Sequence, residues 1–264
     1  MRKIISIIIL VLFVTSCNEY QKALKTEDVA VKLETATKLY EKGKYFKAIT
    51  LFEQIAPAYK GKPQAEKLFY MHSMAYYKNK QYGLSAYHFE SFVSSYPKSE
   101  KLEESAFLAA KSYSKQSTVY SLDQTETDKA IDKLQVFIDS YPNSQYFTEA
   151  NAIVKDLKTK LEKKAYENAK LYNSISDYKA AIVALDNFVS DFPGTPYKED
   201  ALYYKLDSAY QLAINSVVDK MEARLNTAKL SYGSLIKFKA DTKYKKQADE
   251  MMARIEQDLK QFTK

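Results

Sequence analysis

One spacing of small and aromatic residues recurs along the sequence and limits what the chain can fold into. In its clearest copy, Ala130, Leu134, Phe137 and Tyr141 lie four, three and four residues apart. This spacing places all four side chains on one face of an α-helix. Pro142 disfavours the helical conformation for the residue before it, so we expect the helix to end near Tyr141.

The spacing occurs in five copies, of which the first and the last are weaker. The copies begin at Ala48, Ser85, Ala130, Ala181 and Ala228. Repeats of roughly 35 to 50 residues are typical of solenoids built from helix pairs, rather than of one compact core. Three copies are followed by a hydroxyl residue that can cap the next helix. These residues are Ser99, Ser144 and Thr195.

The helix that precedes the first copy extends the pattern to a full helix pair. Ala36, Tyr40, Gly43, Ala48 and Phe52 are spaced as in the tetratricopeptide repeat (TPR), which this stretch resembles. In that repeat, a small residue on each helix lets the two helices approach closely. We therefore expect an all-α, TPR-like superhelical solenoid of about five helix pairs over residues 27–264. Only 5 glycines and 6 prolines interrupt the chain, which favours long helices.

The N-terminus has the layout of an export signal. Two basic residues precede an apolar run over residues 4–14, which is too short to span a bilayer comfortably. The run ends in residues 14–17 (VTSC), which resemble the lipobox of bacterial lipoproteins. This resemblance implies cleavage after residue 16 and lipidation of Cys17, the only cysteine of the chain. An ordinary signal peptide with an incidental cysteine is the alternative.

The lipid is the only membrane anchor that the sequence offers after cleavage. We expect residues 17–26 to form a lipidated cysteine and a short polar tether before the first helix. Asn18 stands where an aspartate would resemble an inner-membrane retention signal. The sequence therefore favours the outer membrane as the location.

The sequence contains no recognisable catalytic or cofactor motif. Its two histidines, His72 and His88, have no cysteine or cluster of acidic residues beside them, so we expect structural roles and no metal site. The 40 basic residues are interspersed with 33 acidic ones, which indicates a solvated helical surface rather than a nucleic-acid-binding face. We expect a protein that is not an enzyme and that binds no cofactor and no nucleic acid.

Two segments depart from the regular pattern. Residues 115–128 form an insertion that we expect to be a polar loop, with Thr127 as a cap for the helix that follows. No helix breaker occurs between residues 146 and 172, which predicts one unusually long helix.

Together these features resemble the BamD family, the lipoproteins of the outer-membrane β-barrel assembly machinery. The resemblance depends on the lipobox, on residues 75–79 (AYYKN), on the insertion before Ala130, and on residues 141–146 (YPNSQY) leading into the long helix. It covers the lipobox and about residues 27–240. The chain departs from the pattern at residues 60–62 (KGK), where a Tyr-Pro stop would be expected.

This resemblance implies a non-catalytic role in recognising and inserting outer-membrane β-barrel proteins, on the periplasmic side of the outer membrane. It implies that the C-terminal half binds a BamA-like barrel protein, alongside other lipoproteins of the machinery. It also implies that an N-terminal groove receives unfolded outer-membrane proteins. Because aromatic residues cluster in the first two repeats, we expect this groove to be lined by Tyr40, Phe69, Tyr70 and Tyr76.

Two other functions fit a lipoprotein with helical repeats. The chain could be a general periplasmic TPR adaptor that serves cell-envelope division or peptidoglycan synthesis. It could also be a nutrient-binding lipoprotein beside an outer-membrane transporter, although such proteins are normally much larger. Purification of the native complex distinguishes these alternatives by the partner protein that it recovers.

Overall fold

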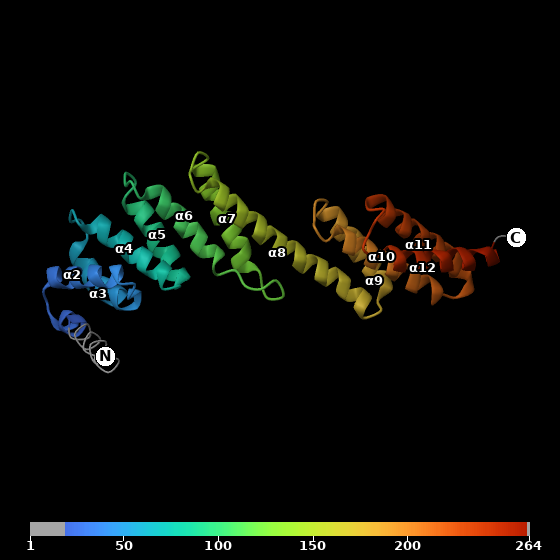
Figure 1. The fold of residues 1–264 in the computed structure, drawn as a ribbon, viewed down its shortest axis with the longest axis horizontal. Coiled ribbons are helices and arrows are strands. Elements are labelled where there is room, and N and C mark those ends of the chain that lie inside the picture. The colour runs from blue at the N-terminus through green and yellow to red at the C-terminus, as the bar shows by residue number, and fades with distance from the viewer. Residues whose placement is uncertain (1–18, 263–264) are drawn as a thin grey trace, which may run out of the picture. The chain divides into compact units, whose positions relative to one another are not determined.

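The computed structural model describes residues 19–262 (Figure 1). The predicted signal peptide and Cys17 lie outside these residues. Every regular element within the described range is a helix, which confirms the all-α, TPR-like fold class. The described helices include none that is both long and apolar enough to span a bilayer. The chain divides into two compact units, with the division within helix α8.

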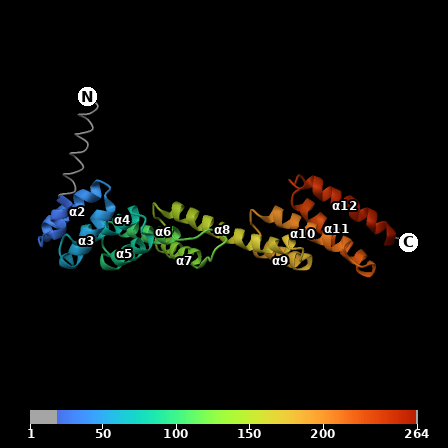
Figure 2. The same cartoon turned by 90° about the horizontal axis from the view of Figure 1, so that it is seen from below.

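The first unit contains three consecutive helix pairs. Helices that are neighbours in the chain also lie side by side (Figures 1 and 2). The pairs are α2 (Val29–Glu41) with α3 (Tyr45–Tyr59), α4 (Ala65–Lys78) with α5 (Tyr82–Ser95), and α6 (Leu102–Ser114) with α7 (Thr125–Ser140). The unit also includes the first part of α8 (Phe147–Ser174), up to residue 157.

The second unit repeats the same architecture with the rest of α8. It contains α9 (Tyr178–Asp191), α10 (Lys198–Ile214), α11 (Val218–Phe238), α12 (Lys245–Leu259) and the 3₁₀-helix η1 (Lys260–Phe262). Residues 119–122 of the loop before α7 also belong to this unit. The predicted terminal helix over residues 243–262 is therefore present as α12 and η1.

Small residues allow close contact within each pair. Ala36 on α2 and Ala48 on α3 are fully buried in one cluster with Phe52. On α7, Ala130 and Leu134 are likewise fully buried, in a cluster with Phe107 of α6. The repeated spacing seen in the sequence is thus the spacing of the core. Burial of such side chains contributes about 1.5–3 kcal/mol for each large one.

The aromatic-proline stops end their helices where the sequence predicts. Helices α5, α7 and α9 end one residue before Tyr96, Tyr141 and Phe192, respectively. Each of these residues has a backbone conformation outside the helical region and still donates its N–H to the carbonyl oxygen four residues earlier. Helix α8, with 28 residues, confirms the predicted long helix.

The predicted tether is wrong for most of its length. Residues 19–25 are helical, and Tyr20 and Ala23 are buried in the same cluster as Leu39 of α2. The physical reason is that Tyr20 and Ala23 are three residues apart, so a short helix presents both to α2. Asp28 then caps α2 by accepting hydrogen bonds from the N–H groups of Ala30 and Val31.

Thr127 and Ser144 do not cap helices as predicted. Thr127 lies inside α7, is fully buried, and shares a hydrogen bond of 2.5 Å with Ser117 across the loop. Ser144 accepts a hydrogen bond of 3.0 Å from the N–H of Tyr146, one residue before α8 begins. It shapes the turn before the helix rather than the first turn of the helix itself.

Ser144 also takes part in a repeated set of contacts, named here the junction clasp. On the first helix of a pair, the clasp uses a glutamate and the aromatic ring four residues after it. In the turn that follows the pair, it uses a serine or threonine, which meets the glutamate, and the side chain two residues later, which meets the ring. Ser144 Oγ donates to Glu103 Oε1 at 2.5 Å. Tyr146 stacks on Phe107 with ring centroids 4.6 Å apart and an interplanar angle of 9°.

A complete second clasp lies in the second unit. Thr242 Oγ1 donates to Glu199 Oε1 at 2.7 Å, and Tyr244 stacks on Tyr203 with ring centroids 3.8 Å apart. Contacts of this kind between aromatic rings stabilise by about 0.5–1.5 kcal/mol beyond their burial.

Two further clasps keep only one of these two contacts unchanged. In the first unit, Ser99 donates to Glu66 Oε1 at 2.6 Å, but Lys101 takes the second position and its ammonium lies 5.3 Å from the Tyr70 ring centroid.

In the second unit, the rings of Tyr166 and Tyr197 stack at 5.3 Å. Glu162 occupies the acidic position of this clasp, but its Oε2 is buried and has no hydrogen-bond partner among the described residues.

Candidate functional site

The four residues predicted to line a groove do not share one surface. Tyr76 of α4 is only 3% exposed. Its hydroxyl donates to Glu53 Oε1 at 2.5 Å, and its ring stacks on His88 with centroids 4.8 Å apart. Burial raises the pKa of the Tyr76 hydroxyl well above its usual range. Tyr76 therefore belongs to the packing between α3, α4 and α5, and its predicted place in an open groove is wrong.

Tyr40 and Tyr70 are half-buried and pack against the same cluster, around Met74 and Phe89. The Tyr70 ring meets Phe89 edge-on, with centroids 6.3 Å apart. Burial, followed by a hydrogen bond with Glu104, raises the pKa of the Tyr70 hydroxyl. These two tyrosines are thus held near each other by packing, with part of each side chain accessible.

Phe69 lies elsewhere, in a hollow of about 530 Å³ that we name the aromatic hollow. The hollow is lined by the α3–α4 turn, by Phe69 and by one flank of α5: Lys60, Gly61, Phe69, Tyr87, His88, Ser91, Phe92, Ser95 and Tyr96. Gly61 has a φ of +81°, which a residue without a Cβ adopts at little cost. Residues 60–62 (KGK), which stand where a Tyr-Pro stop would be expected, therefore form the turn at one wall of this hollow.

A buried histidine lies beneath this region. His72 is 2% exposed, and its ring centroid is 4.7 Å from that of His88 and 4.8 Å from that of Tyr76. Neither ring nitrogen of His72 has a hydrogen-bond partner among the described residues. Burial, and then the charge of His88, lowers the pKa of His72 to about 3. The imidazole is therefore neutral at neutral pH and serves as a packed ring.

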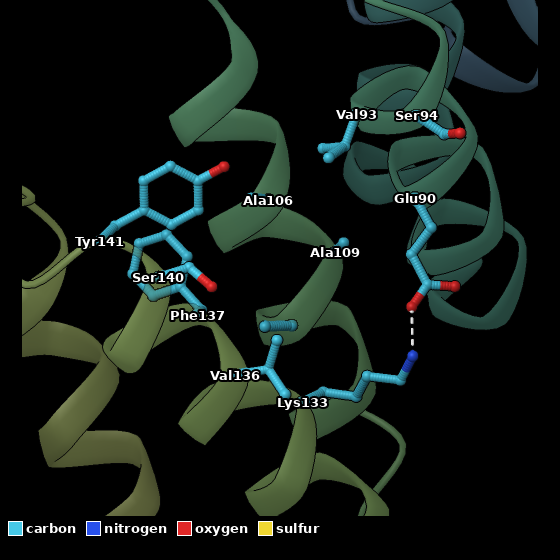
Figure 3. Close-up of a pocket in the computed structure, with 11 residues that line it drawn as sticks. Glu90, Val93, Ser94, Ala106, Ala109, Lys133, Val136, Phe137, Ser140 and Tyr141 are labelled. Atoms are coloured by element: carbon cyan, nitrogen blue, oxygen red, sulfur yellow. Dashed lines mark hydrogen bonds and ion pairs between the residues drawn. The ribbon is translucent and has the colours of Figure 1, made fainter. Parts of the chain in front are cut away.

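A second hollow of about 380 Å³ lies on the other flank of α5, between α5, α6 and α7 (Figure 3). We name it the alanine hollow, because α6 contributes three side chains that end at Cβ and leave the space open. Its lining is Glu90, Val93, Ser94, Ala106, Ala109, Ala110, Lys133, Val136, Phe137, Ser140 and Tyr141. Val136 remains 63% exposed.

The charged groups of the alanine hollow are paired with each other. Lys133 Nζ lies 2.7 Å from Glu90 Oε1. Figure 3 draws this ion pair as a dashed line. The hydroxyl of Tyr113 donates to Glu90 Oε2 at 3.0 Å. Burial, and then this hydrogen bond, raises the pKa of Tyr113 to about 12. The hollow therefore presents an apolar surface with no unbalanced charge, which suits an uncharged side chain.

The two hollows differ in lining but are both open to side chains from outside the unit. The described residues contain no group of three or more His, Cys, Asp or Glu side chains that could hold a metal ion. The two hollows lie on opposite flanks of one helix, α5, within a single unit. An extended chain that crosses α5 could place apolar side chains on both flanks.

A comparison with protein families assigns the chain. The family model described as YfiO, outer membrane lipoprotein, matches residues 27–225. The chain belongs to this family. The matched region includes the whole of the first unit after residue 26, and therefore both hollows.

Individual relatives point to the same group of proteins. The outer membrane protein assembly factor BamD of Caulobacter vibrioides is 22% identical over 204 residues, which cover 77% of this chain and 65% of that protein. The BamD of Xylella fastidiosa is 23% identical over 230 residues, covering 82% of this chain and 78% of that protein.

Among solved structures, a kinesin light chain from Podospora anserina with nearly identical TPR-like repeats matches with a TM-score of 0.33 and 15% identity. The match covers 86% of this chain and 92% of that one. This likeness is too weak to contribute to the assignment.

Proposed function

We propose that this protein is a non-catalytic scaffold of outer-membrane β-barrel assembly that holds unfolded barrel proteins on its first unit. The family match and the names of both BamD relatives support the process. The two hollows on the flanks of α5 support the mode of binding.

The alanine hollow is the observation that carries this proposal. Strands of membrane β-barrels alternate apolar and polar side chains, and their apolar side chains lack a partner until the barrel forms. A hollow with an apolar floor and paired charges accepts such side chains without leaving a charge unpaired. Phe69 in the aromatic hollow offers a second contact, and Tyr40 and Tyr70 remain proposed contacts near by.

A charge placed on the rim of the alanine hollow tests this mode. Val136→Asp introduces a carboxylate on an exposed side chain, so the fold should persist. Val183→Asp on α9 is the matched control, because the two valines are 63% and 60% exposed. The probe is a fluorescent peptide of about ten residues, the length of a barrel strand, from the C-terminus of an outer-membrane barrel protein.

We expect Val136→Asp to weaken peptide binding at least about tenfold, because an apolar side chain would have to desolvate the new carboxylate. Val183→Asp should bind like the unmodified protein. Equal affinity of the two variants would show that the peptide does not use the alanine hollow.

We also propose lipidation at Cys17, attachment to the outer membrane and a periplasmic orientation. The support is the lipobox-like sequence at residues 14–17 and the description of the family as outer membrane lipoproteins. Mass spectrometry of the N-terminal peptide tests the modification directly. A Cys17→Ser variant should leave the membrane fraction, and retention of that variant would contradict lipid anchoring.

The proposed protein partner is a BamA-like barrel protein bound by the second unit, with other lipoproteins of the machinery. Purification of the native complex from solubilised membranes should recover that barrel protein, and depletion should lower the amounts of outer-membrane barrel proteins. Recovery of a cell-wall synthase or a division protein instead would favour the adaptor function.

A further inference from the structure

The folded part of the chain begins almost at the proposed lipid attachment site. Residues 19–25 are helical, and Tyr20 is 9% exposed. The ammonium of Lys47 lies 5.1 Å from the Tyr20 ring centroid, so this short helix packs on α3 as well as on α2. Two peptide units connect Cys17 to Glu19, and they span at most about 7 Å between the two Cα atoms.

This short connection fixes which surface of the first unit lies near the lipid. Glu19 and Tyr20 border a small notch together with Lys38 and Lys42, at the C-terminal end of α2. That end leads through Gly43, with a φ of +69°, into the start of α3. The α2–α3 turn is therefore the part of the fold beside the point where the chain leaves toward Cys17.

The surface of this turn combines positive charge with one exposed ring. Residues 38–47 contain four lysines and one acidic residue, Glu41. Lys38 is paired with Glu34 at 2.7 Å, and Glu19 lies close to it. Phe46 is 65% exposed in the first turn of α3, next to Lys47. We name Lys42, Phe46 and Lys47 the turn patch.

We propose that the turn patch is a second membrane contact, in which its lysines meet anionic lipid headgroups and Phe46 enters the interfacial region. The inference rests on the proposed lipidation of Cys17. A lipid surface fits better than a protein partner, because the covalent connection brings the bilayer to this surface. Stable anchoring also commonly combines acyl chains with a basic patch.

Lipid contact at this turn would hold the first unit against the bilayer, in addition to the attachment through the lipid on Cys17. The protein would meet the bilayer at two points, the acylated Cys17 and the turn patch. Removing one lysine from such a contact weakens the electrostatic attraction to an anionic surface by about fivefold.

The absence of tryptophan from the sequence provides a direct test. Phe46→Trp introduces a single reporter into the full-length protein, which is purified from membranes and reconstituted into vesicles of phosphatidylethanolamine and phosphatidylglycerol with brominated acyl chains. Leu230→Trp on α11 is the control, because Leu230 is 73% exposed in the second unit. Mass spectrometry of the same preparations determines whether Cys17 is acylated.

We expect acylated Cys17, with the emission at position 46 shifted to the blue and quenched by the brominated lipid, and with position 230 unaffected. Adding Lys42→Glu and Lys47→Glu to the position 46 reporter should reduce its quenching. Acylated protein in which positions 46 and 230 behave alike would overturn the turn patch and leave the proposed anchor intact. An unmodified Cys17 would overturn the anchor, and the turn patch with it.

Discussion

The junction clasp between α6 and α8 predicts a measurable loss of stability when its hydroxyl is removed. Ser144→Ala deletes the 2.5 Å hydrogen bond to Glu103 and the acceptor for the N–H of Tyr146. Hydrogen bonds to charged groups contribute about 1.5–3 kcal/mol, and the half-buried Glu103 favours the lower end of that range. With about 0.5 kcal/mol for the solvent-accessible turn bond, the expected cost is about 2 kcal/mol.

Hydrogen exchange followed by mass spectrometry is the suitable assay, because two compact units need not unfold in a single transition. A loss of about 2 kcal/mol corresponds to an exchange rate about 30-fold faster for amides of α6 and the first turns of α8. Ser95→Ala at the exposed end of α5 is the control and should change little.

A double-mutant cycle separates the clasp from a general effect of the alanine. If Ser144 and Glu103 stabilise the fold through each other, Glu103→Ala combined with Ser144→Ala should cost about 1.5 kcal/mol less than the sum of the single changes. Strictly additive costs, or a Ser144→Ala variant that exchanges like Ser95→Ala, would refute the clasp as a stabilising contact.

Three further predictions concern titratable groups. The pKa of His72 is about 3 in the folded protein and 6.5 for a free imidazole. Below pH 6.5 the unfolded chain therefore binds a proton at His72 that the folded protein does not bind, so the stability should fall as the pH drops. His72→Phe should flatten this fall between pH 7 and pH 4.5 in thermal unfolding, and an unchanged slope would contradict the assignment. Hydrogen bonds from Thr242 and then Lys239 lower the pKa of Glu199 to about 2. The ionised Glu199 therefore stabilises the fold fully above about pH 4.5, and this contribution is lost as the pH falls toward 2. Glu199→Gln should therefore make exchange in α12 less dependent on acid, and an acid dependence equal to that of the unmodified protein would speak against it. Because Glu162 Oε2 has no hydrogen-bond partner within residues 19–262, Glu162→Gln should lower the stability by less than about 0.5 kcal/mol, while Glu103→Gln lowers it by more than about 1 kcal/mol. Equal costs of the two changes in hydrogen exchange would contradict the difference between the two clasps.

The sequence predicts the helices well, because local rules determine where they end. Pro97, Pro142 and Pro193 stop their helices through a steric effect on the preceding residue, which needs no knowledge of the fold. The length of α8 follows from the absence of any breaker in the same way. The helical residues 19–25 were missed because a segment of seven residues gives a weak periodic signal without its partner α2.

The candidate site is harder to predict, because it depends on which neighbour each face of a helix meets. Tyr70 and Tyr76 lie on the same helix, yet one retains an accessible edge and the other is enclosed by Glu53 and His88. The alanine hollow arises from side-chain atoms that α6 lacks, at Ala106 and Ala109, combined with the separation of α5 and α7. Spacing alone predicts that these alanines face a neighbour, but not that the neighbour leaves room.

The junction clasp has a consequence for how such a chain can change in length. Its acceptor, such as Glu103, comes from the pair before a junction, and its donor, such as Ser144, from the turn after it. Consider a segment that runs from the serine or threonine of one clasp to that of the next clasp along the chain. If such a segment were duplicated or deleted, each remaining turn between pairs would still have one glutamate acceptor and one hydroxyl donor. Gene rearrangements at these points would therefore preserve the contacts between pairs, so repeat number could drift without new interfaces having to evolve.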